Sequence, residues 1–280
     1  MGQLTSPTFR RRKLARRLRQ MRESAGLTLD EAAPKLDKTK SALSRLETAM
    51  SRADVHIVRS MMDLYDHYDP DLLDLARESR RPGWWKRFNI EDRGLIDMET
   101  EAAIELEFTL VNIPGLLQTE DYMRALFASG KLQRSRERLE NDVAVRLHRQ
   151  QRLTDEEFPL QLVAILDEAA LHRKVGSPEI MQVQFRHLVA CGELSAVTVQ
   201  VLPSDTGAHA GMDGAFMILT FPEDDPSALY IEYPTGSLHV ENPEEVEAAR
   251  LVFDRLRSEA LSPMDSMAFL ERAADRLNRA

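Results

Sequence analysis

The sequence predicts a five-helix N-terminal domain followed by an α+β domain with a mostly antiparallel sheet. Residues 10–78 hold five short segments with helical spacing and capping residues, whereas the chain beyond residue 94 alternates short strand-like runs with longer helical segments. Charge separates the same two regions. Residues 1–60 hold 14 Lys and Arg against six Asp and Glu (+8), and the remaining residues hold 23 against 40 (−17). A basic segment on an acidic body indicates one domain that binds a polyanion and another with a different role.

The connector between the domains is marked by the breaker cluster Arg80-Arg81-Pro82-Gly83, which Trp84-Trp85 follows at once. We divide the chain into a domain of residues 1–78, a connector of residues 79–93 and a domain of residues 94–280. The two tryptophans could stack on a nucleobase or a ligand, but we expect them to pack the connector onto a domain.

Apolar spacing predicts the first helix over residues 10–24, because Leu14, Leu18 and Met21 recur at i, i+4 and i+7. Basic residues occupy its remaining faces. Ala25-Gly26 ends this helix.

Capping residues mark the helices that follow. Thr28 and Glu31 make a capping box for a short second helix, and Thr39 is the expected N-cap of the third. Two further helices are expected at about residues 54–68 and 71–78. Short helices with tight connections indicate a compact all-helical domain.

The second domain mixes strands and helices. The expected strands are the apolar or alternating runs at residues 105–111, 159–166, 196–202, 215–221, 229–233 and 237–240. Helices are expected at about residues 119–129, 135–153 and 178–190, with two more beginning near Pro243 and Pro263. Because the last strands are closely spaced, we expect antiparallel pairing.

Residues 27–49 contain two capped helices joined by a tight turn, the arrangement of a helix-turn-helix motif. Small or apolar residues stand where the helices would cross: Ala32, Ala33, Leu43 and Leu46. Polar residues stand on the outer face of the second helix: Lys40, Ser41, Ser44 and Arg45. Such a face can enter the DNA major groove and donate to base edges, with Lys and Arg suited to guanine.

The segment from Arg10 to Arg22 holds eight basic residues in thirteen positions, which suits phosphate contacts that position the helix-turn-helix on DNA. A solvated helix face is the alternative. We assign phosphate contacts to Arg10, Arg11, Arg12, Arg16, Arg19, Thr28, Thr39 and Arg52. For the two threonines the primary role is capping, with which a phosphate contact is compatible.

Three short motifs then carry a family resemblance: the Leu-x-x-x-Leu-x-x-x-Arg that ends at Arg22, Ala25-Gly26-Leu27-Thr28, and Ser44-Arg45-Leu46-Glu47. Residues 14–64 resemble the XRE-type helix-turn-helix regulators, the family of phage repressors and Cro. The resemblance implies that Lys40, Ser41 and Arg45 face bases. It also implies that Arg22 pairs with Glu47, which braces the first helix against the recognition helix.

The sequence departs from this family pattern at three positions. Asp37 occupies the turn position usually filled by Gly, and Asp tolerates the left-handed region. Leu29 replaces a polar residue that would contact a phosphate. Pro34 falls late in the second helix and should weaken its last turn.

The second domain has a narrower resemblance, carried by the motifs at residues 111–122 (VNIPGLLQTEDY), 166–171, 197–203, 207–209, 213–214 and 253–256. These resemble the actinobacterial WhiJ-like regulators. The resemblance implies a second domain of poorly known role. It also implies a link to small partner proteins, in an arrangement likened to toxin–antitoxin pairs.

Acidic and histidine residues of the second domain are expected to be structural. Asp167 and Glu168 with His172 could act as acid–base groups, but two acids after a strand also begin a helix well. The spacing of His209, Asp213 and His239 matches no metal motif.

Two further features receive similar expectations. The glycine-containing loop at residues 204–214 lacks the arrangement of a phosphate loop, so we expect a mobile connection between strands, with a pocket lid as the alternative. Cys191, at a helix end, is expected to be a buried, inert thiol.

Composition narrows the function further. No apolar run approaches 18 residues, so we expect no membrane span or secretory signal, and the single cysteine fits a reducing cytoplasm. With no catalytic triad, metal set or nucleotide loop, we expect no enzyme, no catalytic residue, no metal and no cofactor.

We therefore expect a sequence-specific transcriptional regulator that binds a double-stranded DNA operator as a homodimer. Its second domain would sense a small-molecule effector, dimerise or bind a protein partner. The alternative is an antitoxin-like interaction protein that holds a small protein encoded nearby and autoregulates its own operon.

Overall fold

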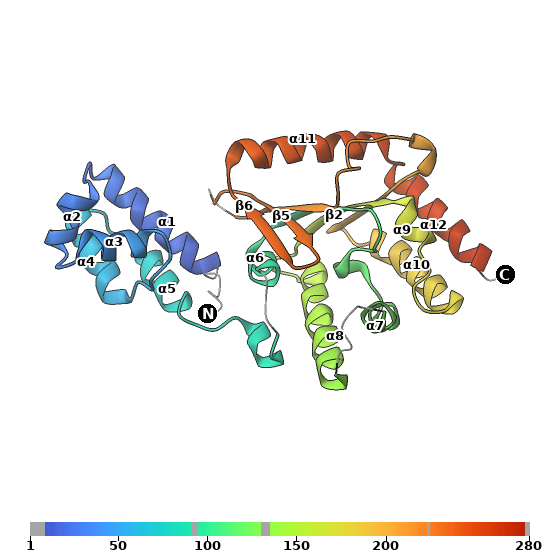
Figure 1. Ribbon diagram of the computed structural model, residues 1–280, viewed down its shortest axis with the longest axis horizontal. Helices are drawn as coiled ribbons and strands as arrows, with labels where there is room; N and C mark the ends of the chain where they lie inside the picture. Colours follow the sequence, from blue (N-terminus) through green and yellow to red (C-terminus); the bar gives the residue numbers. More distant parts are fainter. Residues whose placement is uncertain (1–8, 91–93, 130–134, 223–224, 278–280) are drawn as a thin grey trace. The chain divides into compact units, whose positions relative to one another are not determined.

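The computed structural model describes residues 9–90, 94–129, 135–222 and 225–277 of the 280-residue chain. Contacts between these residues divide the chain into two compact units, one ending at Lys86 and one beginning at Arg87. Figure 1 shows the first unit as the helices α1–α5 and the second as a sheet with helices on both faces.

The N-terminal unit is all-helical between residues 9 and 78. Its helices are α1 (Phe9–Ser24), α2 (Leu29–Lys35), α3 (Lys40–Glu47), α4 (Val55–Tyr65) and α5 (Pro70–Glu78). Side chains of Thr28, Thr39, Asp54 and Asp69 cap α2 to α5 in that order, which satisfies backbone donors that a helix start leaves free. A 3-10 turn follows at Trp84–Phe88.

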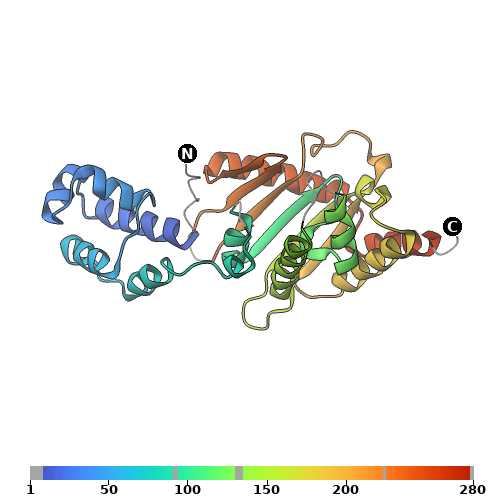
Figure 2. The ribbon, with the colours of Figure 1, turned by 60° about the horizontal axis from the view of Figure 1, so that its bottom comes forward.

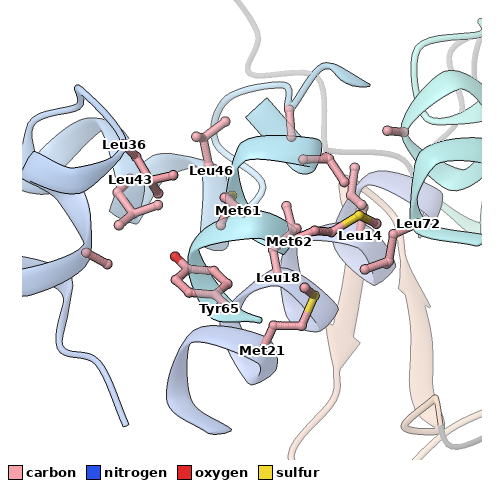
Figure 3. Packing of buried hydrophobic residues seen from close by; sticks show 14 of the residues in the cluster. Leu14, Leu18, Met21, Leu36, Leu43, Leu46, Met61, Met62, Tyr65 and Leu72 are labelled. Atoms are coloured by element: carbon pink, nitrogen blue, oxygen red, sulfur yellow. The ribbon is translucent and has the colours of Figure 1, made fainter. Parts of the chain in front are cut away.

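One apolar cluster holds these helices together. Leu18 from α1, Leu43 from α3 and Met61 from α4 are fully buried, and they point toward one another in Figure 3. The helices α2 to α5 have at most 11 residues, too few to be stable alone in water, so mutual burial supplies most of the stability of the unit.

The C-terminal unit combines one sheet with two sets of helices. Its helices are α6 (Leu95–Glu101), α7 (Glu120–Ala128), α8 (Arg136–Gln150), α9 (Glu168–His172), α10 (Pro178–Gly192), α11 (Pro243–Glu259) and α12 (Pro263–Leu277). Its strands are β1 (Ile104–Thr109), β2 (Gln161–Asp167), β3 (Val197–Leu202), β4 (Phe216–Thr220), β5 (Ala228–Tyr233) and β6 (Gly236–Val240). Short 3-10 turns lie at Gly115–Leu117, Gln151–Thr154 and Ser204–Thr206.

The sheet is mixed, with the strand order β3-β2-β1-β4-β5-β6. β2 pairs in parallel with both β1 and β3, whereas β4 is antiparallel to β1, β5 to β4 and β6 to β5. The prediction of a mostly antiparallel sheet is therefore wrong. The segments between β1, β2 and β3 contain helices that return the chain to the same end of the sheet, and such crossovers make parallel pairs. Antiparallel pairing does hold for the closely spaced last strands.

The two faces of the sheet differ in chemistry because successive strand residues point to opposite sides. Leu106 and Phe108 of β1 and Ile218 of β4 pack with Phe253 and Leu256 of α11 in an apolar cluster. The views in Figures 1 and 2 show α11 on one face of the sheet and α6 and α8 on the other.

The face covered by α6 and α8 contains buried charges. Glu105 and Glu107 of β1 are 0% and 3% exposed, and neither carboxylate oxygen of Glu105 has a hydrogen-bond partner among the described residues. The nearby Arg149 is held by Glu99, with its Nε 2.9 and 3.0 Å from the two carboxylate oxygens. Burial raises the pKa of Glu105 well above its usual range and raises that of Glu107 to about 8.

This burial predicts that the C-terminal unit loses stability as pH rises from about 5 to 8. Above the ordinary carboxyl pKa, the unfolded chain has released the protons of these two glutamates, whereas the folded unit still holds them. A rise in pH across this window therefore favours the unfolded chain. Glu107→Gln should remove much of the slope and stabilise the unit at pH 8 by at least about 1 kcal/mol. Calorimetry of the full chain between pH 5.5 and 8 measures this effect.

The control is Glu247→Gln on α11, whose side chain is 64% exposed. It should leave the pH profile unchanged. An unchanged slope in Glu107→Gln would contradict the assignment of protons to the β1 carboxyl groups.

Candidate functional site

The outer face of α3 is polar, and the opposite face of the helix is apolar. Lys40, Ser41 and Arg45 are exposed, whereas Leu43 and Leu46 on the opposite side are buried at 0% and 8% exposure. α3 packs against α2 and α1, which leaves its polar face open within the N-terminal unit. Ser44 lies half-buried at the edge of this face.

Weak surface contacts order the side chains of this face. Lys40 Nζ lies 2.7 Å from Asp30 Oδ2 at the start of α2, with the two side chains 61% and 68% exposed. Arg45 Nη1 donates to Ser41 Oγ at 3.0 Å. Because exposed ion pairs contribute little free energy, Lys40 and Arg45 can exchange these contacts for base edges or phosphates at low cost.

A buried ion pair fixes α3 to α1. Arg22 Nε donates to Glu47 Oε1 and Arg22 Nη2 to Glu47 Oε2, both at 2.8 Å, and each residue is 6% exposed. Arg22 Nη1 also donates to the carbonyl oxygen of Leu27 at 2.7 Å. The hydrogen bonds to Glu47 raise the pKa of Arg22. This is the pair that the family resemblance implies, and its two parallel hydrogen bonds set the orientation of α3 on the unit.

The turn between α2 and α3 keeps the two helices close. Asp37 has φ +53°, the left-handed conformation that the sequence predicts there, and Lys38 N donates to the Ala33 carbonyl oxygen at 2.9 Å. Pro34 lies in the last turn of α2, which ends at Lys35. Leu29 is half-buried against the core, which accounts for an apolar residue at this position.

Several predicted phosphate contacts lie on open surface. Thr28 and Thr39 accept hydrogen bonds from Glu31 N (3.3 Å) and Ala42 N (3.1 Å) as N-caps, and both are exposed. Arg52 is exposed in the loop before α4, and Arg19 is exposed in an ion pair with Glu23 at 2.7 Å. Lys38, which sequence reasoning did not select, is exposed in the turn before α3. Its position in the turn between two capped helices is the sequence feature that would have added it to the predicted phosphate contacts.

The first turns of α1 are arranged differently. Arg10, Arg11, Arg12 and Arg16 are half-buried, and Arg10 Nη1 lies 4.0 Å from Glu78 Oε2 at the end of α5. The α1 basic residues therefore divide between packing within the unit and exposure. Their contact with DNA phosphates remains a prediction.

Asp167 and His209 join the carboxyl ends of the parallel strands to the loop at residues 204–214. His209 Nε2 lies 3.2 Å from Asp167 Oδ2, and His209 Nδ1 accepts from Gly211 N at 3.2 Å. A Cβ at Gly211 would lie only 2.2 Å from the ring of Phe108, so this glycine lets the loop approach the sheet closely. The His209–Asp167 contact and the close approach at Gly211 hold the loop against the sheet, and the mobility expected from its composition stays a prediction. Both ring nitrogens of His209 thus have a partner, Nε2 at the end of β2 and Nδ1 within the loop.

The other acidic and histidine candidates are also part of local structure. Asp167 Oδ1 accepts from Ala169 N at 2.8 Å and so caps α9, and Glu168 accepts from Ser204 N at 2.8 Å. The cap from Asp167 is the helix-start role that the sequence favours, whereas Glu168 also ties α9 to the turn at Ser204–Thr206. His239 Nε2 lies 3.1 Å from Ser237 Oγ. In the part of the chain that the structure describes, no three His, Cys, Asp or Glu residues are grouped to hold a metal ion.

Cys191 and Trp85 are buried, and Trp84 is half-buried. Burial raises the pKa of the Cys191 thiol to about 11, so it is protonated at neutral pH. Trp85 is 5% exposed and meets Trp84 edge to face, with ring centroids 5.9 Å apart. Packing therefore occupies Trp85, as the sequence favours.

Comparisons with known proteins give a separate match for each of the two units of the chain. A model of a domain of unknown function, DUF5753, matches residues 92–272, and a model of a helix-turn-helix domain matches residues 13–76. The chain belongs to the DUF5753 family. In this family member, the helix-turn-helix match includes α2, the turn and the whole of α3, and it supports an XRE-like DNA-binding regulator.

No curated protein and no solved structure matches this DUF5753 protein. Among its described helices, none combines the length and the apolar character that crossing a bilayer requires.

The buried ion pair predicts a marked stability effect in the N-terminal unit. Glu47→Leu leaves the guanidinium of Arg22 buried without its partner, so the free energy of unfolding should fall by about 3 kcal/mol. Denaturant unfolding of the full chain, followed by a signal from the N-terminal unit, measures the loss.

The double substitution Arg22→Met/Glu47→Leu is the matched control, because it removes both charges together. It should recover part of the stability lost in Glu47→Leu. Equal stability of the single and double variants would contradict a buried charge as the cause.

Proposed function

We propose that this DUF5753 protein is a sequence-specific transcriptional regulator of the XRE type whose α3 enters the DNA major groove. The observation that carries the proposal is the open polar face of α3, with Lys40, Ser41 and Arg45 held outward by the buried Arg22–Glu47 pair. The positive net charge of residues 1–60 adds attraction to a polyanion.

The proposal includes a homodimer on a double-stranded operator. One small helix-turn-helix domain contacts few base pairs, whereas two copies would contact half-sites about 10 bp apart. We assign effector sensing, dimerisation or partner binding to the acidic second domain, place the protein in the cytoplasm with its DNA, and assign it no enzyme activity. The motifs at residues 111–122 and 197–203 favour the actinobacterial WhiJ-like subtype.

The same resemblance supports the alternative of an antitoxin-like protein that binds a small partner encoded nearby. Co-purification from a two-gene expression plasmid separates the two proposals. A stable complex with the neighbouring gene product, together with autoregulation of that operon, would favour the antitoxin-like function.

Selection of bound fragments from a random double-stranded DNA pool tests the main proposal. An enriched motif with two-fold symmetry is expected for a dimeric regulator. Recovery of fragments without any common sequence would reject sequence-specific recognition.

Arg45 should contribute to base preference more than to general DNA affinity. Arg45→Ala should weaken binding to the selected operator by about 1–3 kcal/mol, because a base contact is lost, while binding to random DNA changes less. Fluorescence anisotropy on both DNAs at one salt concentration measures the two affinities.

Arg45→Lys keeps the charge but cannot make a bidentate contact to guanine, so it should also lose specificity. Equal losses on operator and random DNA in Arg45→Ala would reject a base contact by this side chain.

Asp30 should act against DNA binding, because its carboxylate lies 2.7 Å from Lys40 Nζ at the edge of the binding face. Asp30→Asn should raise DNA affinity about two- to fivefold, which corresponds to the small free energy of an exposed ion pair. The control is Asp74→Asn on α5. Asp74 is also exposed and also pairs with a basic residue, Arg77. A similar gain in both variants would show that only net charge matters.

A further inference from the structure

A cavity of about 280 Å³ lies in the C-terminal unit between α9, α10 and α12. These three helices lie together at one end of the sheet in Figures 1 and 2. The walls are mostly apolar, with side chains from all three helices: Leu171, Met181, Phe185, Phe269, Ala273 and Leu277. None of the polar groups discussed above except His172 belongs to this cavity.

The remaining lining residues are all basic: His172, Lys174, Arg272 and Arg276. Among the residues that the structure describes, no acidic side chain lines the cavity, although residues 61–280 have a net charge of −17. His172 pairs with Glu168, but Lys174, Arg272 and Arg276 have no hydrogen bond or ion pair to any residue that the structure describes. The cavity is therefore a local site of positive potential on an acidic unit.

Helix stability alone does not account for this arrangement. Arg272 and Arg276 lie toward the C-terminus of α12, where cations favour the helix dipole. Lys174, however, lines the same cavity from the segment between α9 and α10, outside α12. The acidic residues of the same part of α12, Glu271 and Asp275, do not line the cavity.

We propose that this cavity binds a small amphipathic acid as the effector of the protein. The apolar body of the ligand packs against Phe185 and Phe269, and its anionic head pairs with Arg272, Arg276 and Lys174. The volume suits a short acyl chain or a small aromatic ring system, near the lower limit of small-molecule sites. The proposed binding is argued from the cavity alone, whereas the role of the ligand as an effector rests on the proposed regulatory function.

Titration calorimetry of the full chain with octanoate and 1-naphthoate tests the binding step without DNA. We expect saturable binding of at least one of these acids. The neutral 1-octanol and the cationic octylamine should bind at least about tenfold more weakly than octanoate, because they lack a charge-assisted pair with the arginines.

Variants locate the site. Arg272→Gln and Arg276→Gln should each weaken acid binding about tenfold, and Ala273→Leu should weaken it by filling the cavity without a change of charge. Arg186→Gln is the matched control, since Arg186 is exposed on α10 outside the cavity. Thermal unfolding identifies any variant that fails to fold, and binding is compared among the folded ones.

Three outcomes would overturn the proposal: no saturable binding of either acid, equal binding of octanoate and 1-octanol, or unchanged binding in both arginine variants. The selection from random DNA gives an independent result for the helix-turn-helix. Acid binding without sequence-specific DNA binding would reject the proposed regulatory function and keep the proposed acid site. DNA binding without acid binding would reject the acid site and keep the regulatory function.

Discussion

The pairing of Arg22 with Glu47 is the constraint on which the proposed DNA-binding surface depends. α3 has only eight residues, too few to be helical alone, so its direction comes from its tertiary contacts. Apolar packing of Leu43 and Leu46 is non-directional, whereas two parallel hydrogen bonds between planar groups fix a rotation. The pair thus links α1 to the C-terminal end of α3, whose opposite face is exposed. Its burial makes the link strong only while both partners are present.

The N-terminal unit separates strong contacts from weak ones. Contacts that define the fold are buried, as with Leu18 and Met61, and those at the proposed DNA surface are exposed pairs such as Lys40 with Asp30. Exposed pairs are easily replaced by a ligand of higher charge density. The same separation holds in the C-terminal unit, where His209 is fixed by two contacts and the basic residues around the α9–α10–α12 cavity are free of partners among the described residues.

Local signals predicted most of the elements but not their pairing. Thr28, Thr39 and Asp37 act within four residues of the features they define, so the sequence places two helix starts and one left-handed turn correctly. The parallel partners of β2 lie far away along the chain, and no local pattern distinguishes them. α6 escaped prediction because its seven residues give a short periodic signal and, unlike the equally short α2, it begins after Gly94 without a side-chain cap. The partial burial of Arg10 beside Glu78 of α5 was equally unpredictable, because the spacing of basic residues alone resembles that of a solvated face.

The position of β1 has a consequence for the order in which the chain acquires structure. β1 is the first strand to leave the ribosome, yet it lies between β2 and β4, and its pairing with β4 joins residues more than 100 positions apart. The C-terminal unit therefore cannot complete the middle of its sheet until most of the polypeptide has been synthesised, and loop closure of this length slows folding. The N-terminal unit closes its core within 80 residues. A nascent chain can thus hold a finished DNA-binding head while β1 still exposes the apolar side of an unpaired strand.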